Sequence, residues 1–556
     1  MNNANLSEMQ NLSLKGTPAN RGIAFGHISF LQRFSSIHTK HTIIDVEAEC
    51  NRFEKARLHA ISQLGALYDV SLEKLGEQNA VLFQIHQMML DDPDYVEAIN
   101  NVIKNEQANA EYAVDIVARR FEQQFRAMDN DYMQGRATDV IDVSRRVNEI
   151  LMMHAGKLKN NGIKYRDNGQ TILATDDLAP SETVQLDQGK VTAIITSAGS
   201  TRSHTVIFAR TMGIPTVVCI GDDLKESLEG KFAIVDGASG LIIINPDEKT
   251  IEKYVSLKRT VDAQQAHLEQ FRGKKTVTRQ GRQICLYANA GSLADLDLVK
   301  SSDAEGIGLF RSEYIFLQAH DYPTEDEQFE VYKELLSQMD GKRVIIRTLD
   351  IGADKTCEYF MLKHEENPAM GLRAIRLCLS NKVLFKTQLR ALLRASMYGR
   401  LAIMVPMITT VEEVQECLKI LSEVKKDLSA QGTPFKDDIE FGIMIETPAA
   451  ALISDELAVL VDFFSIGTND LTQFTLAADR QNSNIAKYLD PFHHAVLRLI
   501  ETTINNGHAA GIWVGICGEG ASNDKFLAKL IQLGIDEISV VPPNVLRLRA
   551  RIATLG

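Results

Sequence analysis

The stretches 441–451 (FGIMIETPAAA) and 463–470 (FFSIGTND) decide the fold of the C-terminal half of this 556-residue chain. Each begins as a short apolar run and continues into polar residues, as a β-strand does where it leaves a buried sheet. Similar runs recur at 284–288, 307–310, 344–347, 402–406, 441–445, 463–466, 512–516 and 537–541. Because segments long enough for a helix separate most of them, the pattern predicts a TIM barrel, with an open doubly wound sheet as the alternative.

In a TIM barrel the active site lies at the C-terminal ends of the strands. Several polar side chains follow the runs at that end: Asn289, Arg311, Arg347, Glu446, Asn469, Asp470 and Cys517. The arginines predict an anionic substrate, because a guanidinium matches carboxylate and phosphate oxygens. The alternative for each charged residue is an ion pair that serves only the fold.

Glu446 and Asp470 are either a pair of general bases or oxygen ligands for Mg²⁺. The neighbouring arginines favour the metal, since Mg²⁺ commonly bridges acids and phosphoryl oxygens. Cys517 is either a small buried apolar side chain or, at its strand end, a proton donor to a carbanion-like intermediate.

The N-terminal half has a different pattern. We expect a short β segment within 12–35, then helices over 45–159, where the stretch VLFQIHQMMLDDPDY reads as a helix that stops near Pro93. An α/β region follows, with one clear helix at 203–212, and a charged stretch at 248–271 reads as a helical linker. The β runs of this region lie at 171–175, 192–196, 216–219, 232–236 and 241–244.

His204 is predicted at the N-terminus of the 203–212 helix, after a small polar turn. Unpaired N–H groups and the helix dipole favour an anion there, so a neutral imidazole could attack phosphorus and become a phosphohistidine. A solvated or capping histidine is the alternative from spacing alone.

Composition excludes several classes of function. The net charge of −13 provides no basic excess for a nucleic-acid backbone. No apolar run is long enough to span a membrane, and the N-terminus does not read as a secretory signal. Seven scattered cysteines, with no C-x-x-C pair, predict a reducing compartment, so we expect a cytoplasmic protein.

Ordered motifs resemble the Enzyme I family, the phosphoenolpyruvate–protein phosphotransferases of the bacterial sugar uptake system. The first is GSTRSHTVIFAR around His204. The barrel motifs are GIGLFRSEYIFL, RTLDIGADK, NPAMGLRAIR, GIMIETPAAA, FFSIGTNDLTQFTLAADRQN and VGICGEGAS, and the helical region adds VLFQIHQMMLDDP and DYMQGRATDVIDVSRRV. The resemblance extends from about Gly16 to the C-terminus.

The resemblance implies a role for each matching residue. His204 would be the phosphorylated nucleophile, and Cys517 would protonate the enolate to give pyruvate. Glu446 and Asp470 would ligate Mg²⁺. The positions that would bind phosphoenolpyruvate are Arg311, Arg347, Lys355, Arg373, Asn469, Asp470 and Arg480.

The resemblance also implies the domain plan of a multidomain α/β protein. A swivelling phosphohistidine domain would comprise 12–44 and 160–247, with a helical insert at 45–159 that binds the phosphocarrier protein HPr. A linker helix at 248–275 would join it to the phosphoenolpyruvate-binding barrel at 276–556. The protein would form a homodimer through its barrels.

Three alternatives stay open at this point: a dikinase-like enzyme that uses phosphoenolpyruvate, a non-catalytic regulator, and a Mg²⁺-dependent lyase. The chain also departs from the usual family motif, which is closer to G-G-x-T-S-H, because Ser200 and Arg202 replace a glycine and a threonine. The substitution puts in doubt any role of that threonine hydroxyl. Arg202 either lies in solvent or pairs with the phosphoryl group on His204.

Overall fold

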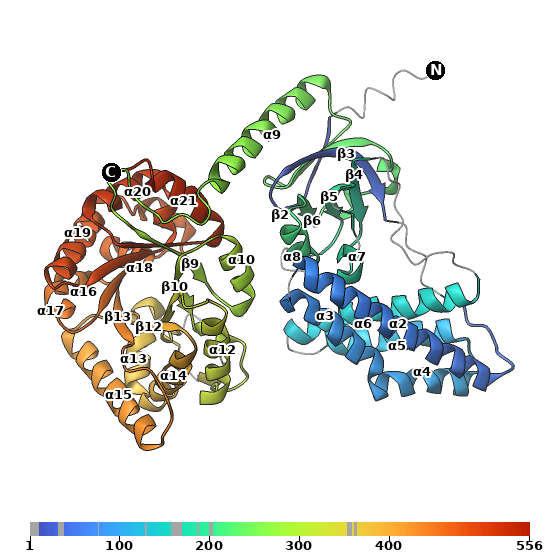
Figure 1. Ribbon diagram of the computed structural model, residues 1–556, viewed down its shortest axis with the longest axis horizontal. Helices are drawn as coiled ribbons and strands as arrows, with labels where there is room; N and C mark the ends of the chain where they lie inside the picture. Colours follow the sequence, from blue (N-terminus) through green and yellow to red (C-terminus); the bar gives the residue numbers. More distant parts are fainter. Residues whose placement is uncertain are drawn as a thin grey trace. The chain divides into compact units, whose positions relative to one another are not determined.

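The computed structural model divides the chain into two compact units, residues 1–263 and 264–556 (Figure 1). The structure describes residues 11–31, 38–75, 77–127, 131–156, 169–184, 186–187, 189–199, 204–352, 358–360 and 364–556. Each unit has its own hydrophobic core. Helix α9 (Glu248–Glu269) contains the boundary between the units, where the sequence predicts a linker.

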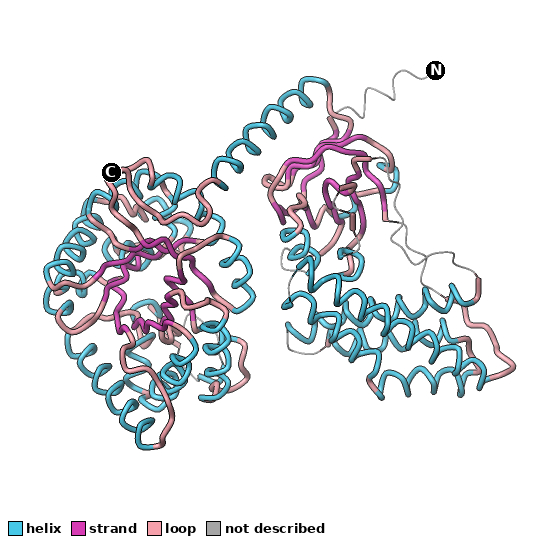
Figure 2. Tube along the Cα trace, in the orientation of Figure 1, coloured by secondary structure: helices cyan, strands magenta, loops and turns pink. Residues whose placement is uncertain are grey.

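The C-terminal unit is a closed barrel of parallel strands, in the order β10-β11-β12-β13-β14-β15-β16-β9. These are β9 (Cys285–Ala290), β10 (Gly306–Arg311), β11 (Arg343–Arg347), β12 (Arg400–Val405), β13 (Glu440–Ile445), β14 (Phe463–Gly467), β15 (Trp513–Cys517) and β16 (Glu537–Val540). Figure 2 shows the strands as an inner ring within a shell of helices. The prediction of a TIM barrel is confirmed, and the open sheet was the wrong alternative.

Helices surround this barrel and bury one face against the strands. They are α10 (Leu296–Ser301), α11 (Glu313–Leu317), α12 (Glu325–Ser337), α13 (Ala374–Ser380), α14 (Lys382–Ala395), α15 (Val411–Ala430), α16 (Pro448–Leu452), α17 (Ser454–Ala458), α18 (Thr468–Leu476), α19 (His494–Ala509), α20 (Asp524–Leu533) and α21 (Val545–Ile552). Capping boxes begin α12, at Thr324 with Glu327, and α15, at Thr410 with Glu413. Such boxes satisfy free N–H groups and fix where a helix begins.

The N-terminal unit contains one sheet of eight strands, in the order β1-β8-β7-β3-β4-β5-β6-β2. They are β1 (Leu12–Lys15), β2 (Thr17–Asn20), β3 (Ile23–Phe30), β4 (Thr171–Thr175), β5 (Val191–Thr196), β6 (Thr216–Val218), β7 (Phe232–Asp236) and β8 (Leu241–Ile244). The β segment predicted at GIAFGHISFL within 12–35 is confirmed as β3, but that stretch also contains two strands that were not predicted, β1 and β2. Gly16 lies between β1 and β2. Gly22 lies between β2 and β3, and few residues other than glycine adopt its φ of +134°.

A helical bundle lies between β3 and β4 in the sequence, as the pattern over 45–159 predicts. Its helices are α2 (Val46–Leu75), α3 (Glu77–Asp91), α4 (Pro93–Glu106), α5 (Ala110–Arg126) and α6 (Asp131–His154). The stop near Pro93 is confirmed, since Asp92 caps α4 and accepts from Asp94 N at 2.8 Å. Phe208, from α8 (His204–Thr211), is buried in the bundle core, so the bundle supports the helix that begins at His204.

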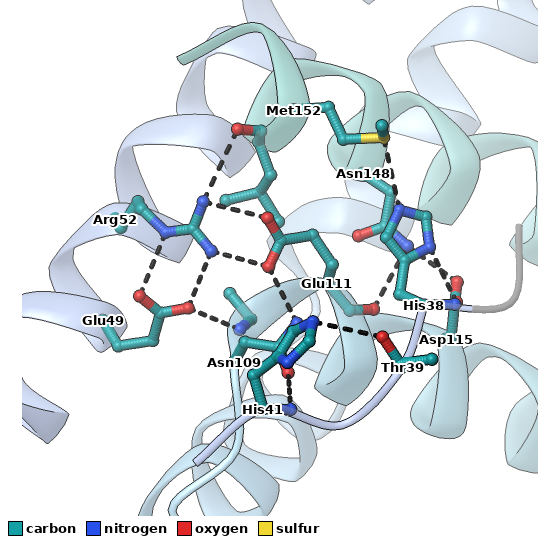
Figure 3. Close-up of polar contacts among 12 residues, drawn as sticks. His38, Thr39, His41, Glu49, Arg52, Asn109, Glu111, Asp115, Asn148 and Met152 are labelled. Atoms are coloured by element: carbon teal, nitrogen blue, oxygen red, sulfur yellow. Dashed lines mark hydrogen bonds and ion pairs between the residues drawn. The ribbon is translucent and has the colours of Figure 1, made fainter. Parts of the chain in front are cut away.

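A network of charged side chains joins the helices of this bundle (Figure 3). The guanidinium of Arg52 contacts Glu49 at 2.7 Å and Glu111 at 2.6 Å. Glu49 also accepts a hydrogen bond from the Ala110 amide at 2.6 Å, where α5 begins. One arginine therefore ties α2 to α5 and balances two carboxylates.

The remaining helices are α7 (Pro180–Val184) and α8, which pack beside each other. No helix within the described ranges is long and apolar enough to cross a membrane.

Candidate active site

A cavity of about 870 Å³ at the C-terminal end of the barrel collects most of the predicted residues. Because all the strands are parallel, their C-terminal ends meet at one rim. The predicted residues that line the cavity are Asn289, Arg311, Arg347, Glu446, Asn469, Asp470, Arg480 and Cys517. Cationic, acidic, amide and thiol groups therefore share one space.

Arg347 ends β11 and is only 7% exposed. Its guanidinium forms an ion pair with Glu313 and another with Asp350 at 3.0 Å. These carboxylates balance the buried cation and fix the direction of its N–H groups. Arg311 ends β10 and is exposed, whereas Arg480 lies beyond α18 with its side chain 43% exposed. The cavity thus combines one fixed guanidinium with two more accessible ones.

Sequence reasoning missed Glu313 and Asp350, which also line the cavity. The available signal was their position, two and three residues after the strand-end arginines Arg311 and Arg347. Arg373 is not among the lining residues in the described chain; it is buried and pairs with Asp350 at 2.8 Å. Lys355 and Arg202 lie outside the described residues.

Two acidic side chains lie at the cavity without a full set of partners. Glu446 follows β13 and is 1% exposed, and its Oε1 accepts from Met407 N at 2.7 Å. Burial, together with the negative charges of Asp470 and Asp350, raises the pKa of Glu446 to about 8. Asp470 lies in the first turn of α18, and its buried Oδ1 accepts no hydrogen bond within the described ranges.

Glu446 and Asp470 fit a divalent cation that a substrate would help to hold. No group of three or more His, Cys, Asp or Glu side chains forms a metal site by itself in the described parts of the chain. Mg²⁺ in phosphate sites, however, is usually held by one or two carboxylates together with substrate oxygens and water. The mutual repulsion of these acids and the free Oδ1 of Asp470 suit that role.

Cys517 ends β15 and is 3% exposed. Ser465 Oγ donates to its Sγ at 3.5 Å, and the thiol donates to the Ile466 carbonyl at 3.7 Å. Burial raises the pKa of Cys517 to about 12. The group at the cavity is therefore a neutral thiol, which can give a proton and is not a thiolate nucleophile.

His204 is the first residue of α8, and the structure describes its backbone. Beyond the end of β5, Gly199 has a φ of +99°, a value that favours glycine. Cys219 Sγ donates to the Gly199 carbonyl at 2.9 Å and holds this residue in place. The helix start agrees with the sequence expectation to within one residue.

The barrel with its arginine-lined cavity fits an enzyme that acts on an anionic substrate. Three family models described as PEP-utilising enzyme match this chain: the N-terminal domain at 15–136, the mobile domain at 168–240 and the PEP-binding domain at 265–556. Enzymes of this class use a metal ion.

The chain belongs to the phosphoenolpyruvate–protein phosphotransferase family. It is 43% identical to the phosphoenolpyruvate-protein phosphotransferase of Geobacillus stearothermophilus, over 98% of this chain and 93% of that protein. The protein of the same name from Listeria innocua is 42% identical, over 98% of this chain and 94% of its own length. A solution structure titled Enzyme I (nEIt) matches 45% of this chain and 99% of its own, at 30% identity and a TM-score of 0.38.

Proposed function

We propose that this enzyme takes the phosphoryl group from phosphoenolpyruvate, carries it on His204 and passes it to the phosphocarrier protein HPr, releasing pyruvate. The main support is the single cavity in which Arg311, Arg347 and Arg480 meet the acids Glu446 and Asp470. During phosphoryl transfer, the negative charge on the phosphoryl oxygens must be neutralised, and the donor must be held in line with the attacking group. These side chains can do both.

Arg347 is the main anchor for the phosphate in this proposal. Its guanidinium cannot turn away, because Glu313 and Asp350 hold it, yet it still lines the cavity. Arg311 and Arg480 complete the phosphate site from the rim, and Asn469 donates to the substrate from the first turn of α18. Lys355 and Arg373 are assigned supporting positions by resemblance.

The metal in the proposal is Mg²⁺, held by Glu446 and Asp470. When bound, it supplies positive charge against the phosphate and carboxylate oxygens of the substrate. The neutral thiol of Cys517 then protonates the methylene carbon of the enolate, which converts enolpyruvate into pyruvate.

His204 lies outside the barrel unit, so its domain must reach the barrel mouth and then the carrier protein. We propose further that the domain swivels at α9 and that HPr docks on the helical insert. The protein would form a homodimer through its barrels and work in the cytoplasm. The domain boundaries are proposed as the sequence predicts them. The support is the sequence resemblance together with the relatives' shared name.

Phosphoenolpyruvate labelled on phosphorus tests the proposal directly. We expect acid-labile label on the protein, transfer of that label to HPr, and no label on His204→Ala, which should still bind phosphoenolpyruvate. Label that persists on the variant would contradict the assignment of His204. A lyase would form product without labelling the protein, and a regulator would do neither.

A further inference from the structure

Two buried apolar side chains line the otherwise polar cavity of the barrel. Leu309 of β10 is 4% exposed and Met444 of β13 is 2% exposed, and both border the cavity. The leucine and the valine that also line it, Leu298 and Val541, are 40% and 47% exposed. Leu309 and Met444 therefore form an apolar floor, whereas Leu298 and Val541 belong to the rim.

Met444 lies where the groups of the proposed site meet. It precedes Glu446 by two residues, so both side chains point into the barrel. Arg347 Nη1 donates to its Sδ at 3.8 Å, and its Cε lies 3.0 Å from the place of a Cβ added at Gly467. Gly467 is in turn the register partner of Cys517. Met444 is thus beside the phosphate anchor, a proposed Mg²⁺ ligand and the strand end that carries the thiol.

The apolar floor matches the one apolar part of the proposed substrate. Leu309, Met444 and Cys517 belong to the same apolar cluster inside the barrel. Phosphoenolpyruvate has two anionic groups, which the arginines and the metal bind in the proposed reaction, and one methylene carbon. With the anionic groups held there, the methylene carbon faces the apolar floor. This orientation brings it to the Cys517 thiol, where the proposed reaction protonates it.

We propose that Met444 and Leu309 position the methylene carbon of phosphoenolpyruvate at Cys517 and exclude substrates with a substituent on that carbon. The inference rests on the proposed function and specifies the substrate class of the same site: enol phosphates of 2-oxo acids whose third carbon is an unsubstituted methylene. A methyl group added there would have to displace a side chain that is 2% or 4% exposed in a packed interior.

The test compares phosphoenolpyruvate with (Z)-2-phosphoenolbutyrate, which carries a methyl group on that carbon. Formation of the 2-oxo acid with Mg²⁺ and excess HPr gives kcat/KM for each substrate. In Met444→Ala, the ratio of kcat/KM for phosphoenolbutyrate to that for phosphoenolpyruvate should rise at least about tenfold, the lower range for one carbon in an apolar pocket. Leu309→Ala should raise the ratio too. Met444→Leu, which keeps the apolar volume, should keep the wild-type ratio.

Met404→Ala is the matched control. Met404 is a buried methionine of the same apolar cluster and the register partner of Arg347, but it is not among the described residues that line the cavity. Its truncation should destabilise the barrel as that of Met444 does and leave the ratio unchanged. Trp513, the single tryptophan and part of β15, reports by its emission whether each variant has folded.

An unchanged ratio in Met444→Ala and Leu309→Ala would overturn the inference. An equal rise in Met404→Ala would overturn it too, because it would show a general loosening of the barrel. If Met444→Ala does not fold, Leu309→Ala decides by the same ratio. The proposed function fails separately, if the wild-type protein forms neither pyruvate nor phosphorylated HPr from phosphoenolpyruvate. If it forms both while the ratio is equal in all variants, only the role of the apolar floor fails.

Discussion

The helical bundle and the barrel bury carboxylates under opposite conditions. In the bundle, Arg52 lies between Glu49 and Glu111. Burial alone would raise the pKa of Glu111, but the hydrogen bonds from Arg52 lower that pKa to about 2. In the barrel, burial raises the pKa of both Glu446 and Glu537 to about 8. Glu111 is therefore a stronger acid than a free glutamic acid, whereas Glu446 and Glu537 are weaker ones.

The difference separates acids that support the fold from acids that are available for chemistry. A carboxylate paired with a buried guanidinium is stable as an anion and has no remaining oxygen for a metal or a proton. An acid left without a cation costs stability, and it can take up Mg²⁺ or hold a proton. Asp115 and Glu149 are exceptions in the bundle, because burial raises the pKa of each, in Asp115 despite the contact with His38.

The largest effect is expected where the two acids proposed to hold Mg²⁺ are removed from the cavity. Glu446→Gln or Asp470→Asn should lower turnover by about three orders of magnitude or more, since each removes a charge proposed to hold Mg²⁺. Steady-state rates across a Mg²⁺ titration measure the loss, which should come with weaker apparent Mg²⁺ affinity. Stability should not fall in Glu446→Gln, which breaks no ion pair among the described residues, whereas Asp470→Asn also removes the 3.4 Å ion pair with Arg480, whose side chain is 43% exposed. A variant with normal turnover and normal Mg²⁺ dependence would remove that residue from the site.

The next effect concerns stability in the bundle. Arg52→Met leaves Glu49 and Glu111 buried without their cation, and we expect the free energy of unfolding to fall by about 3–5 kcal/mol. Urea unfolding followed by far-ultraviolet circular dichroism measures the loss of helix. The emission of Trp513 should report an unchanged transition for the barrel.

A matched exposed pair provides the control for that variant. Arg126 pairs with Glu122 on the same face of α5, with the arginine side chain 64% exposed. Arg126→Met should change the free energy of unfolding by less than about 0.5 kcal/mol. Equal effects of the two substitutions would show that the Arg52 network is no more than a surface feature.

The sequence predicted most strands because each is an apolar run between turns. The runs 171–175, 232–236 and 241–244 coincide with β4, β7 and β8. Strands β1 and β2 within 12–35 were not predicted, since β1 pairs with β8 and β2 pairs with β6, both far along the chain. Pairing over such distances leaves no local signal.

The candidate site divides in the same way. Arg347 and Glu446 were predictable, because a charged residue that directly follows an apolar strand in a TIM barrel lies at the active rim. Glu313 and Asp350 were predictable only as polar residues close to a strand end, since the ion pairs by which they hold Arg347 appear only in three dimensions. Glu537 was hidden too, because only the barrel register shows that it points inward beside Gly515.

The amount by which buried Glu537 lowers the free energy of unfolding of the barrel should depend on pH. Unfolded glutamate has a pKa of about 4.3, so as pH rises above that value the unfolded chain ionises while folded Glu537 keeps its proton up to about pH 8. The barrel is destabilised over that window, by up to about 1.4 kcal/mol per pH unit. Glu537→Gln removes this dependence, so its stability relative to wild type, measured by urea unfolding of Trp513, should rise by about 4 kcal/mol at most between pH 5 and 8. A constant difference would show that Glu537 is ionised in the fold.

The paired acid of the bundle should respond in the opposite direction. The folded pKa of Glu111 lies below that of the unfolded chain, so its contribution is complete above about pH 5 and is lost as pH falls through about 4 towards 2. The window corresponds to about 3 kcal/mol. Glu111→Gln should therefore be less stable than wild type at pH 6, and the gap should close at pH 2 in urea unfolding followed by circular dichroism. Burial raises the pKa of Asp115 and of Glu149, so their contributions have the opposite sign, but they are the same in both proteins and cancel in the comparison. If the difference in free energy of unfolding between wild type and Glu111→Gln stays constant down to pH 2, the contact with Arg52 does not depend on the charge of Glu111.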